Sequence, residues 1–184
     1  MASHVAIEAN PLLSLLTSDA LTEDTYKTIL KRYYGFFRPL ENALRASEFA
    51  ASVVPDLPAH FKSSELTEDL LGFGFTGQEI EQLQFCSSLP PMTTRALLLG
   101  VMYVMEGSAL GGLMIAKHLA ARSFYTPARG SFFHSDPKGV SSRWKDFLLL
   151  LETVPASEHP ETVTSAIRTF DVLDRWMAEG SPTL

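Results

Sequence analysis

The sequence predicts an all-α protein, and three observations lead to this fold class. Sustained alternation of apolar and polar residues is nearly absent, and so are the Asn-Gly and Asp-Gly pairs that are typical of hairpins. Patterns that begin helices recur along the chain. A long, mainly apolar stretch without proline runs from Met92 to Arg122. The length of 184 residues suits one domain, residues 1–184, with its own core.

The first half of the chain carries several of these helix-start signals. Thr22 precedes two acidic residues, which stabilise the first turn of a helix. Thr76 and Glu79 form the Thr-x-x-Glu pattern of a capping box. Leu57–Leu71 has a weaker and interrupted pattern, and Pro11 predicts a bend in the first helix. We therefore expect helices over Ser3–Leu16, Glu23–Ala46, Leu57–Leu71 and Thr76–Ser87.

The second half is divided by proline and glycine. Pro90 and Pro91 break the chain before the long central helix, Met92–Arg122. Two prolines and two glycines predict a loop over Phe124–Gly139. Two further helices are expected, over Ser142–Val154 and over Ser157–Glu179 with Ser157 as N-cap.

Charge and cysteine content exclude several classes of protein. The formal charge of −6 and the lack of a basic stripe argue against a nucleic-acid partner. The single cysteine, Cys86, excludes an internal disulfide and fits the reducing cytoplasm. The apolar run Ala96–Met105 is too short to span a bilayer, and Glu106 interrupts its continuation. No secretory signal is recognised, so we expect a cytoplasmic protein without a membrane partner.

Common catalytic and metal motifs are missing from the sequence. A ferritin-like di-iron site needs Glu-x-x-His pairs, and the chain contains none. A cysteine pair for zinc or an iron–sulfur cluster, a phosphate-binding GxxxxGK[ST] loop and a G-x-S-x-G elbow are likewise lacking. Any chemistry must therefore use a different set of residues.

Among the five histidines, His4 stands out. Glu8 follows it by four residues, so the two share one face of a helix. A metal-ligating imidazole usually donates its second N–H to an acceptor such as a carboxylate. His118 lies near the C-terminal end of the central helix, where the helix dipole favours it. The other three are expected to face solvent: His60, His134 and His159.

The central stretch "YVMEGSALGGLMIAKHL", Tyr103–Leu119, contains three glycines in a segment that otherwise reads as helix: Gly107, Gly111 and Gly112. Gly100 lies upstream of it. Each glycine inside a helix costs up to roughly 1 kcal/mol relative to alanine. Something must approach this backbone so closely that side chains would obstruct it.

These segments resemble, in order, the biliverdin-producing heme oxygenases, especially the bacterial branch found near phytochromes. "HVAIEANPLLSLL" (4–16) resembles the proximal helix of the family, and "LTEDTYKTILKRYYGFFRPLENAL" (21–44) its second helix. "YVMEGSALGGLMIAKHL" resembles its distal helix almost position for position. Weaker similarities are "EDLLGFG" (68–74), "SRWKDFLLLLE" (142–152) and "AIRTFDVLDRWM" (166–177).

The resemblance implies a heme-oxygenase-like helical bundle with heme sandwiched between proximal and distal helices. It implies oxidative cleavage of heme to biliverdin with release of ferrous iron and carbon monoxide, heme being both substrate and cofactor. An external electron donor, such as a ferredoxin or a flavin reductase, is then required. A phytochrome is the implied receiver of biliverdin.

The resemblance also implies roles for individual residues. His4 matches the axial ligand of the heme iron, and Glu8 is placed to hold its ring. The catalytic positions that match the distal helix are Gly107, Ser108, Gly111 and Gly112. The glycines would let the backbone approach the oxygen side of the ring as a steric wall. Ser108 falls where animal members have an aspartate that organises water, and bacterial members often have serine.

For the heme propionates, Tyr103, Arg143 and Lys145 are candidate partners, because cations suit carboxylates. A surface ion pair for each cation, and core packing for Tyr103, remain open alternatives. Glu106 could take part in ordering water, but pairing of this buried acid with an arginine is the favoured interpretation.

Two other functions are left open by the residues. Only Met1-Ala2-Ser3 precede His4, whereas family members carry a longer segment there, which favours an inactive protein that binds heme or another tetrapyrrole. Alternatively, Gly107 and Gly111 could mark a close helix–helix crossing of the small-xxx-small kind, inside an oligomer or the core.

Overall fold

The structure, a computed structural model, describes residues 10–54 and 56–179, and within these ranges it is helical and contains no strand. This confirms the all-α fold class. The elements are η1 (Leu13–Thr17), α2 (Glu23–Ala46), α3 (Ala50–Val53), η2 (Leu57–His60), α4 (Ser63–Gly72), α5 (Gly77–Glu81), α6 (Arg95–Leu119), η3 (Pro127–Arg129), α7 (Pro137–Glu152) and α8 (His159–Ala178).

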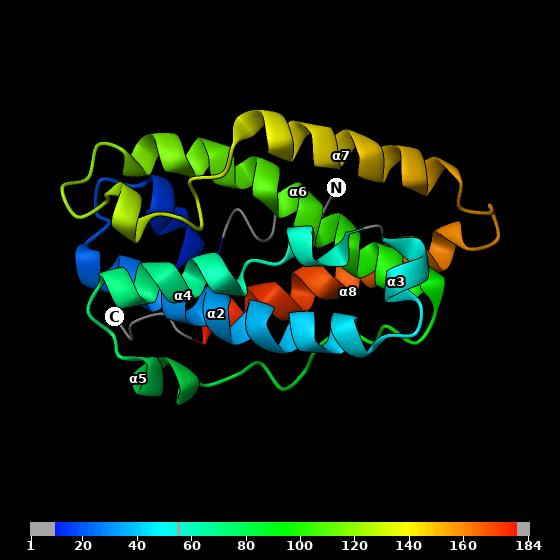
Figure 1. The fold of residues 1–184 in the computed structure, drawn as a ribbon, viewed down its shortest axis with the longest axis horizontal. Coiled ribbons are helices and arrows are strands. Elements are labelled where there is room, and N and C mark those ends of the chain that lie inside the picture. The colour runs from blue at the N-terminus through cyan, green and yellow to red at the C-terminus, as the bar shows by residue number, and fades with distance from the viewer. Residues whose placement is uncertain (1–9, 55, 180–184) are drawn as a thin grey trace.

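The long helices lie in layers around α8. Figure 1 shows α8 between α6 and α2, with α7 running along the outer side of α6 and α4 beside α2. The pairs that pack most extensively are α6 with α8, α2 with α4, and α6 with α7. Their buried apolar side chains form one continuous hydrophobic cluster, which also includes residues of η1 and the loop after η3.

Helix α2 keeps an internal proline by using the backbone group that the proline releases. Thr22 caps the helix, accepting a hydrogen bond from the backbone N–H of Thr25. Pro39 cannot donate to the carbonyl of Gly35 four residues earlier. The backbone N–H of Cys86 donates to that carbonyl instead, at 2.9 Å. The chain that follows α5 is therefore tied to the middle of α2.

Gly100 permits the closest contact between α6 and α8. A Cβ atom at this position would lie 2.5 Å from the carbonyl oxygen of Thr162 and 2.8 Å from the backbone nitrogen of Ala166. It would also collide with the Cβ of Ser165. The Ser165 hydroxyl donates to the carbonyl oxygen of Leu97 at 2.6 Å. The two helices therefore meet through backbone atoms at this glycine.

Several sequence-based boundaries need correction. Helix α7 begins at Pro137 instead of Ser142, because Asp136 caps it by accepting from the backbone N–H groups of Lys138 and Gly139. The predicted cap Ser157 is wrong, since α8 begins at His159 without a side-chain cap. Helix α5 ends at Glu81, well before Ser87.

Two segments match their predictions in type but differ in detail. The described part of the N-terminal segment is a 3-10 helix, not an α-helix. The interrupted 57–71 segment divides into η2 and α4.

The capping box of Thr76 and Glu79 is confirmed, with both hydrogen bonds formed. Helix α2 has the predicted bounds.

Helix α6 is long and apolar enough to cross a membrane by length and composition alone, and half of its most apolar window is buried inside the protein. Its packing against α7 and α8 accounts for that apolar character. We therefore interpret α6 as the central helix of the hydrophobic core.

Buried tyrosines predict a loss of stability at alkaline pH. Burial raises the pKa of Tyr26 and Tyr33 above the ordinary value of 10.0, and raises the pKa of Tyr125 to about 12. Between pH 10 and 12 the unfolded chain loses tyrosine protons that the folded chain retains. The free energy of unfolding then falls as pH rises, by up to about 1.4 kcal/mol per pH unit for each such group.

Urea unfolding followed by circular dichroism from pH 8 to pH 11.5 measures this slope. Tyr26→Phe is the informative variant, because the Tyr26 hydroxyl is buried without a hydrogen-bond partner among the described residues. We expect Tyr26→Phe to flatten the decline above pH 10 with little cost at pH 8. An unchanged slope would contradict the assignment.

Candidate active site

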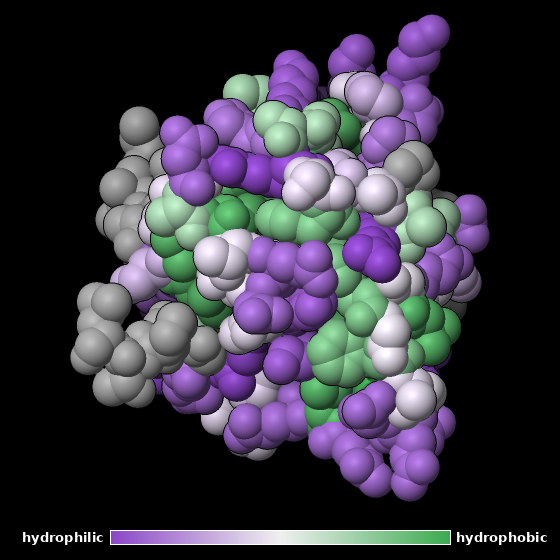
Figure 2. All heavy atoms as spheres, turned by 90° about the vertical axis from the view of Figure 1, so that its left-hand side faces the viewer, coloured by the Kyte–Doolittle hydropathy of each residue, from purple (hydrophilic) through white to green (hydrophobic). Residues whose placement is uncertain are grey.

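A cavity of about 640 Å³ lies beside the C-terminal half of α6. Its walls come from η1, α2, α6, α7, α8 and the loop between η3 and α7, and they are mainly apolar. Figure 2 views the end of the molecule where this loop lies. On this face, apolar side chains gather in patches that polar side chains border. The lining residues from outside α6 include Leu13, Leu16, Tyr33, Phe37, Phe132, Phe133, Trp144 and Leu173.

Three glycines of α6 form one wall of this cavity, and we call Gly107, Gly111 and Gly112 the glycine face. A Cβ atom at Gly111 would meet no described heavy atom within 4 Å. Cβ atoms at Gly107 and Gly112 would lie at ordinary contact distance, 3.7 Å from Trp144 and from Phe133, respectively. The glycine face therefore borders open space.

This geometry separates two explanations for the glycines of α6. A close crossing of the small-xxx-small kind requires neighbouring backbone against the glycines, as found at Gly100. No described helix makes such a contact at Gly107 or Gly111, so a crossing among the described helices does not explain these two glycines. Space for a ligand close to the backbone does explain them.

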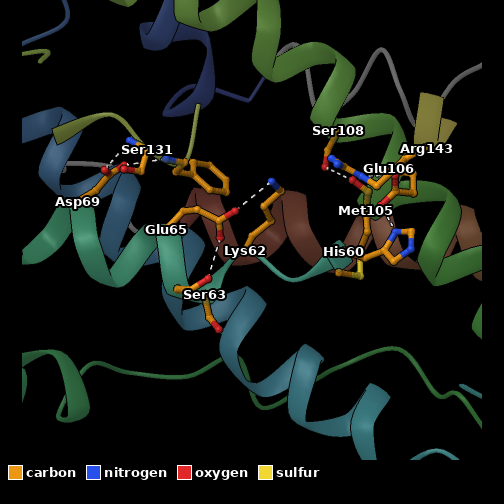
Figure 3. Close-up of polar contacts among 12 residues, drawn as sticks. His60, Lys62, Ser63, Glu65, Asp69, Met105, Glu106, Ser108, Ser131 and Arg143 are labelled. Atoms are coloured by element: carbon orange, nitrogen blue, oxygen red, sulfur yellow. Dashed lines mark hydrogen bonds and ion pairs between the residues drawn. The ribbon is translucent and has the colours of Figure 1, made fainter. Parts of the chain in front are cut away.

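A buried carboxylate holds the loop that contributes Phe132 and Phe133 to the cavity lining. We call these two residues the aromatic floor of the cavity. Asp69 of α4 is fully buried and accepts from the backbone N–H groups of Ser131, at 2.6 Å, and Phe132, at 3.0 Å (Figure 3). Burial raises the pKa of the Asp69 carboxyl, although these hydrogen bonds favour its charged form. The two bonds fix the segment that presents Phe132 and Phe133 to the cavity.

Lys62 brings a formal charge to the cavity lining. A carboxylate oxygen of Glu41 accepts from the backbone N–H of Lys62 at 2.5 Å and from that of Ser63 at 2.9 Å, where α4 begins. The negative charge of the fully buried Glu41 suits this helix N-terminus. The Lys62 ammonium lies 3.4 Å from Glu65 (Figure 3). Sequence reasoning missed Lys62, because the buried partner Glu41 lies on another helix.

Glu106 precedes the glycine face and is almost completely buried, with 3% of its surface exposed. One of its carboxylate oxygens lies 2.6 Å from Nδ1 of His60, and the other lies 3.6 Å from Nε of Arg143. Figure 3 shows the three side chains together. The predicted pairing of Glu106 with an arginine is confirmed. The prediction that His60 faces solvent is wrong.

A protein-family model, described as Heme oxygenase, matches residues 1–179. This match covers nearly the whole chain and includes every wall of the cavity. The chain belongs to the heme oxygenase family. The family accounts for the glycine face next to an apolar cavity, because its members bind a flat macrocycle, heme, as both substrate and prosthetic group.

Two solved heme oxygenase structures share the fold. The enzyme from Neisseria meningitidis, solved with NO and CO bound, has 19% identity and a TM-score of 0.75 over 97% of this chain and 88% of that chain. The enzyme from Leptospira interrogans has 18% identity and a TM-score of 0.76 over 97% of this chain and 94% of that chain. At these identities the similarity establishes the fold. None of the curated proteins compared with the chain matches it significantly.

Three observations show that the cavity of this heme oxygenase suits a heme. Its volume lies in the range of small-molecule sites, roughly 300–1,000 Å³. Its walls are apolar and aromatic, as suits a hydrophobic ring. The glycine face leaves the backbone of α6 uncovered on the side of the cavity.

The structure brings together the site residues predicted on α6. Tyr103, Ser108 and the glycine face all line the cavity. The Ser108 hydroxyl donates to the carbonyl oxygen of Met105 at 2.8 Å, which leaves its own oxygen able to accept a hydrogen bond. The roles inferred for these residues from the resemblance stay predictions.

The other predicted residues lie outside the cavity lining or outside the described ranges. Arg143 lies beside Glu106, and Lys145 is exposed on α7; neither is part of the described lining. His118 is exposed, with its Nδ1 3.0 Å from the carbonyl oxygen of Met114. His4 and Glu8 fall outside the described residues.

Proposed function

We propose that this heme oxygenase binds heme against the glycine face and cleaves it to biliverdin, releasing ferrous iron and carbon monoxide. The observation that carries the proposal is the glycine face itself. It is a row of positions where side chains would enter an apolar cavity and meet almost no protein atom. When bound, heme supplies both the iron that activates oxygen and the ring that is oxidised.

His4 is the proposed axial ligand of the iron, with Glu8 orienting its ring through the second imidazole nitrogen. Asn10 supports this proposal, because it anchors the segment that follows. Its side-chain amide donates to the backbone carbonyl of Asp174 at 3.0 Å and to its carboxylate at 2.7 Å. The Asn10 side chain also accepts from the backbone N–H of Leu12. The chain at Asn10 is thereby fixed to α8 next to the cavity.

Residues in and near the cavity wall have several proposed roles. The glycine face holds the α6 backbone close to the ring, which limits where oxygen can lie, and the aromatic floor excludes bulk water. Ser108 holds a water molecule through its hydroxyl oxygen, in place of the carboxylate that animal members use. Tyr103, Arg143 and Lys145 are the proposed partners of the propionates, and Lys62 adds positive charge to the lining.

The reaction requires electrons from a reductase partner. We propose a ferredoxin or a flavin reductase as donor, and a cytoplasmic location, in agreement with the single buried Cys86. The resemblance to the branch found near phytochromes supports transfer of biliverdin to a phytochrome.

A hemin titration followed by turnover tests the function. We expect a sharp Soret band that saturates with added hemin, and biliverdin absorbance once a reductant and oxygen are supplied. A stable Soret band without biliverdin would instead identify a heme-binding protein without turnover.

The axial assignment gives a separate prediction. We expect His4→Ala to lose the sharp Soret band, and added imidazole to restore it by occupying the vacated coordination position. His118→Ala is the matched control and should keep the band, because His118 is exposed and lies outside the cavity lining. If His4→Ala leaves the absorbance spectrum unchanged, the axial ligand is a different residue.

A further inference from the structure

Glu106 and its two partners join three separate elements at the level of the glycine face. Glu106 belongs to α6, His60 ends η2, and Arg143 lies in the second turn of α7. An ionised carboxylate has only acceptors, and the His60 tautomer that carries a proton on Nδ1 donates to Glu106 across 2.6 Å. We call Glu106, His60 and Arg143 the Glu106 clamp (Figure 3).

The clamp does not itself touch the cavity. None of its three residues is part of the described lining, although Gly107 and Ser108, the next two residues after Glu106, both are. Successive residues of a helix point about 100° apart, which places Glu106 on the side of α6 next to the cavity wall. Any effect of the clamp on a bound ligand must therefore pass through the backbone of α6.

The glycine face offers little packing of its own to fix α6 in rotation. A Cβ at Gly111 would meet no described atom, and those at Gly107 and Gly112 would have only ordinary contacts. Rotation of the helix by 20° would move its Cα atoms by about 0.8 Å, given a radius of about 2.3 Å. A shift of this size changes which backbone atoms meet a ligand. The packing of α6 against α8 at Gly100 restrains the helix about two turns earlier, so a contact next to the glycines is the one that restrains their local rotation.

The clamp supplies such a contact. Hydrogen bonds between charged and neutral groups in a buried site are stronger than those between neutral groups. Breaking a buried pair by removing one partner leaves the other charge without compensation, so the arrangement is strongly preferred. Arg143 is held less tightly than His60, because its buried Nε lies 3.6 Å from Glu106 and has no hydrogen-bond partner among the described residues. The short contact with His60 is therefore the stronger one.

We propose that the Glu106 clamp fixes the rotation of α6 and so sets where the ring of bound heme meets the glycine face. Glu106 is a positioning residue for the site of ring opening, acting through the backbone of Gly107 and Ser108. The inference rests on the proposed function for the identity of the ligand and for the ring opening that the isomer ratio reports.

The test compares wild type, Glu106→Gln and Glu106→Ala in three measurements. In the heme-free protein, hydrogen exchange of the backbone amides of residues 103–112 is expected to increase by about tenfold in Glu106→Ala. In the cyanide-inhibited heme complex, the NMR shifts of the heme methyl groups report how the ring is seated, and we expect them to change. Under turnover, the ratio of minor to major biliverdin isomers should change by about tenfold, equivalent to about 1.4 kcal/mol.

Glu106→Gln keeps the shape and can still accept from His60, so smaller changes in the same direction are expected. Because it preserves packing, it also tests the proposal if Glu106→Ala fails to fold. Ser165→Ala is the matched control. It removes a buried hydrogen bond to α6 at Leu97, away from the glycines, and should lower stability without moving the isomer ratio or the methyl shifts.

Unchanged methyl shifts and exchange in both Glu106 variants, or equal changes in Ser165→Ala, would overturn the proposal. Failure of the proposed function looks different. A wild-type protein that binds hemin without forming biliverdin would leave the exchange and methyl-shift measurements to decide on the clamp. A wild-type protein that does not bind hemin would refute the proposed function and the positioning of heme, while hydrogen exchange in the heme-free variants would still show whether the clamp restrains α6.

Discussion

Gly100→Ala is expected to lower the free energy of unfolding of the heme-free protein by about 1–2 kcal/mol. The added methyl group would lie 2.5 Å from a carbonyl oxygen and 2.8 Å from a backbone nitrogen of α8. Neither can move without shifting the helix, and overpacking of this kind typically costs about 1–3 kcal/mol. The better helix propensity of alanine offsets at most about 1 kcal/mol. Urea unfolding followed by circular dichroism measures the difference.

Gly111→Ala is the control for this prediction, because it makes the same chemical change on the same helix without a described neighbour. Its expected effect has the opposite sign: the heme-free protein should become more stable by about 0.5–1 kcal/mol through helix propensity alone. If both variants changed stability in the same direction and by the same amount, the separation of packing glycine from cavity glycine would be contradicted.

Gly111→Leu is expected to weaken hemin binding by roughly 100-fold, equal to about 2.7 kcal/mol, while the heme-free protein remains folded. The four added carbon atoms would extend from α6 into the cavity, where the ring has to lie against the backbone. Hemin titration followed at the Soret band gives the dissociation constant.

Lys117→Leu provides the matched control for the bulkier residue. It places leucine on the same helix at an exposed position outside the cavity lining, and should leave hemin affinity unchanged. Equal affinities of Gly111→Leu and wild type would show that the ring does not approach the glycine face.

Local signals in the sequence were sufficient to predict much of the fold. Helix α2 has the predicted bounds because Thr22 caps it and its apolar periodicity continues to Ala46. The capping box at Thr76 fixed the start of α5 for the same reason. The start of α7 was misplaced, although Asp136 followed by Pro137 is itself a start signal. Pro137 is compatible with a loop and with the first turn of a helix, and in the structure it is the first residue of α7.

The site was less predictable, because its polar groups meet across elements. His60 resembled a surface residue in sequence, and only the packing of η2 against α6 brings it to Glu106. Lys62 enters the cavity lining next to a cap provided by Glu41 of a different helix. The glycines of α6 formed one pattern in sequence but have two physical causes: Gly100 contacts a helix, and the glycine face borders a cavity. For His60, Lys62 and the glycines, the environment depends on contacts between separate elements, which the sequence does not contain.

The stoichiometry of heme breakdown by the purified protein tests the proposed reaction directly. Hemin is bound to the chain, a reductase and its electron source are added in air, and biliverdin and carbon monoxide are quantified against the heme consumed. We expect equimolar biliverdin and carbon monoxide for each heme lost. Heme that persists under these conditions, or that disappears without carbon monoxide, would contradict it.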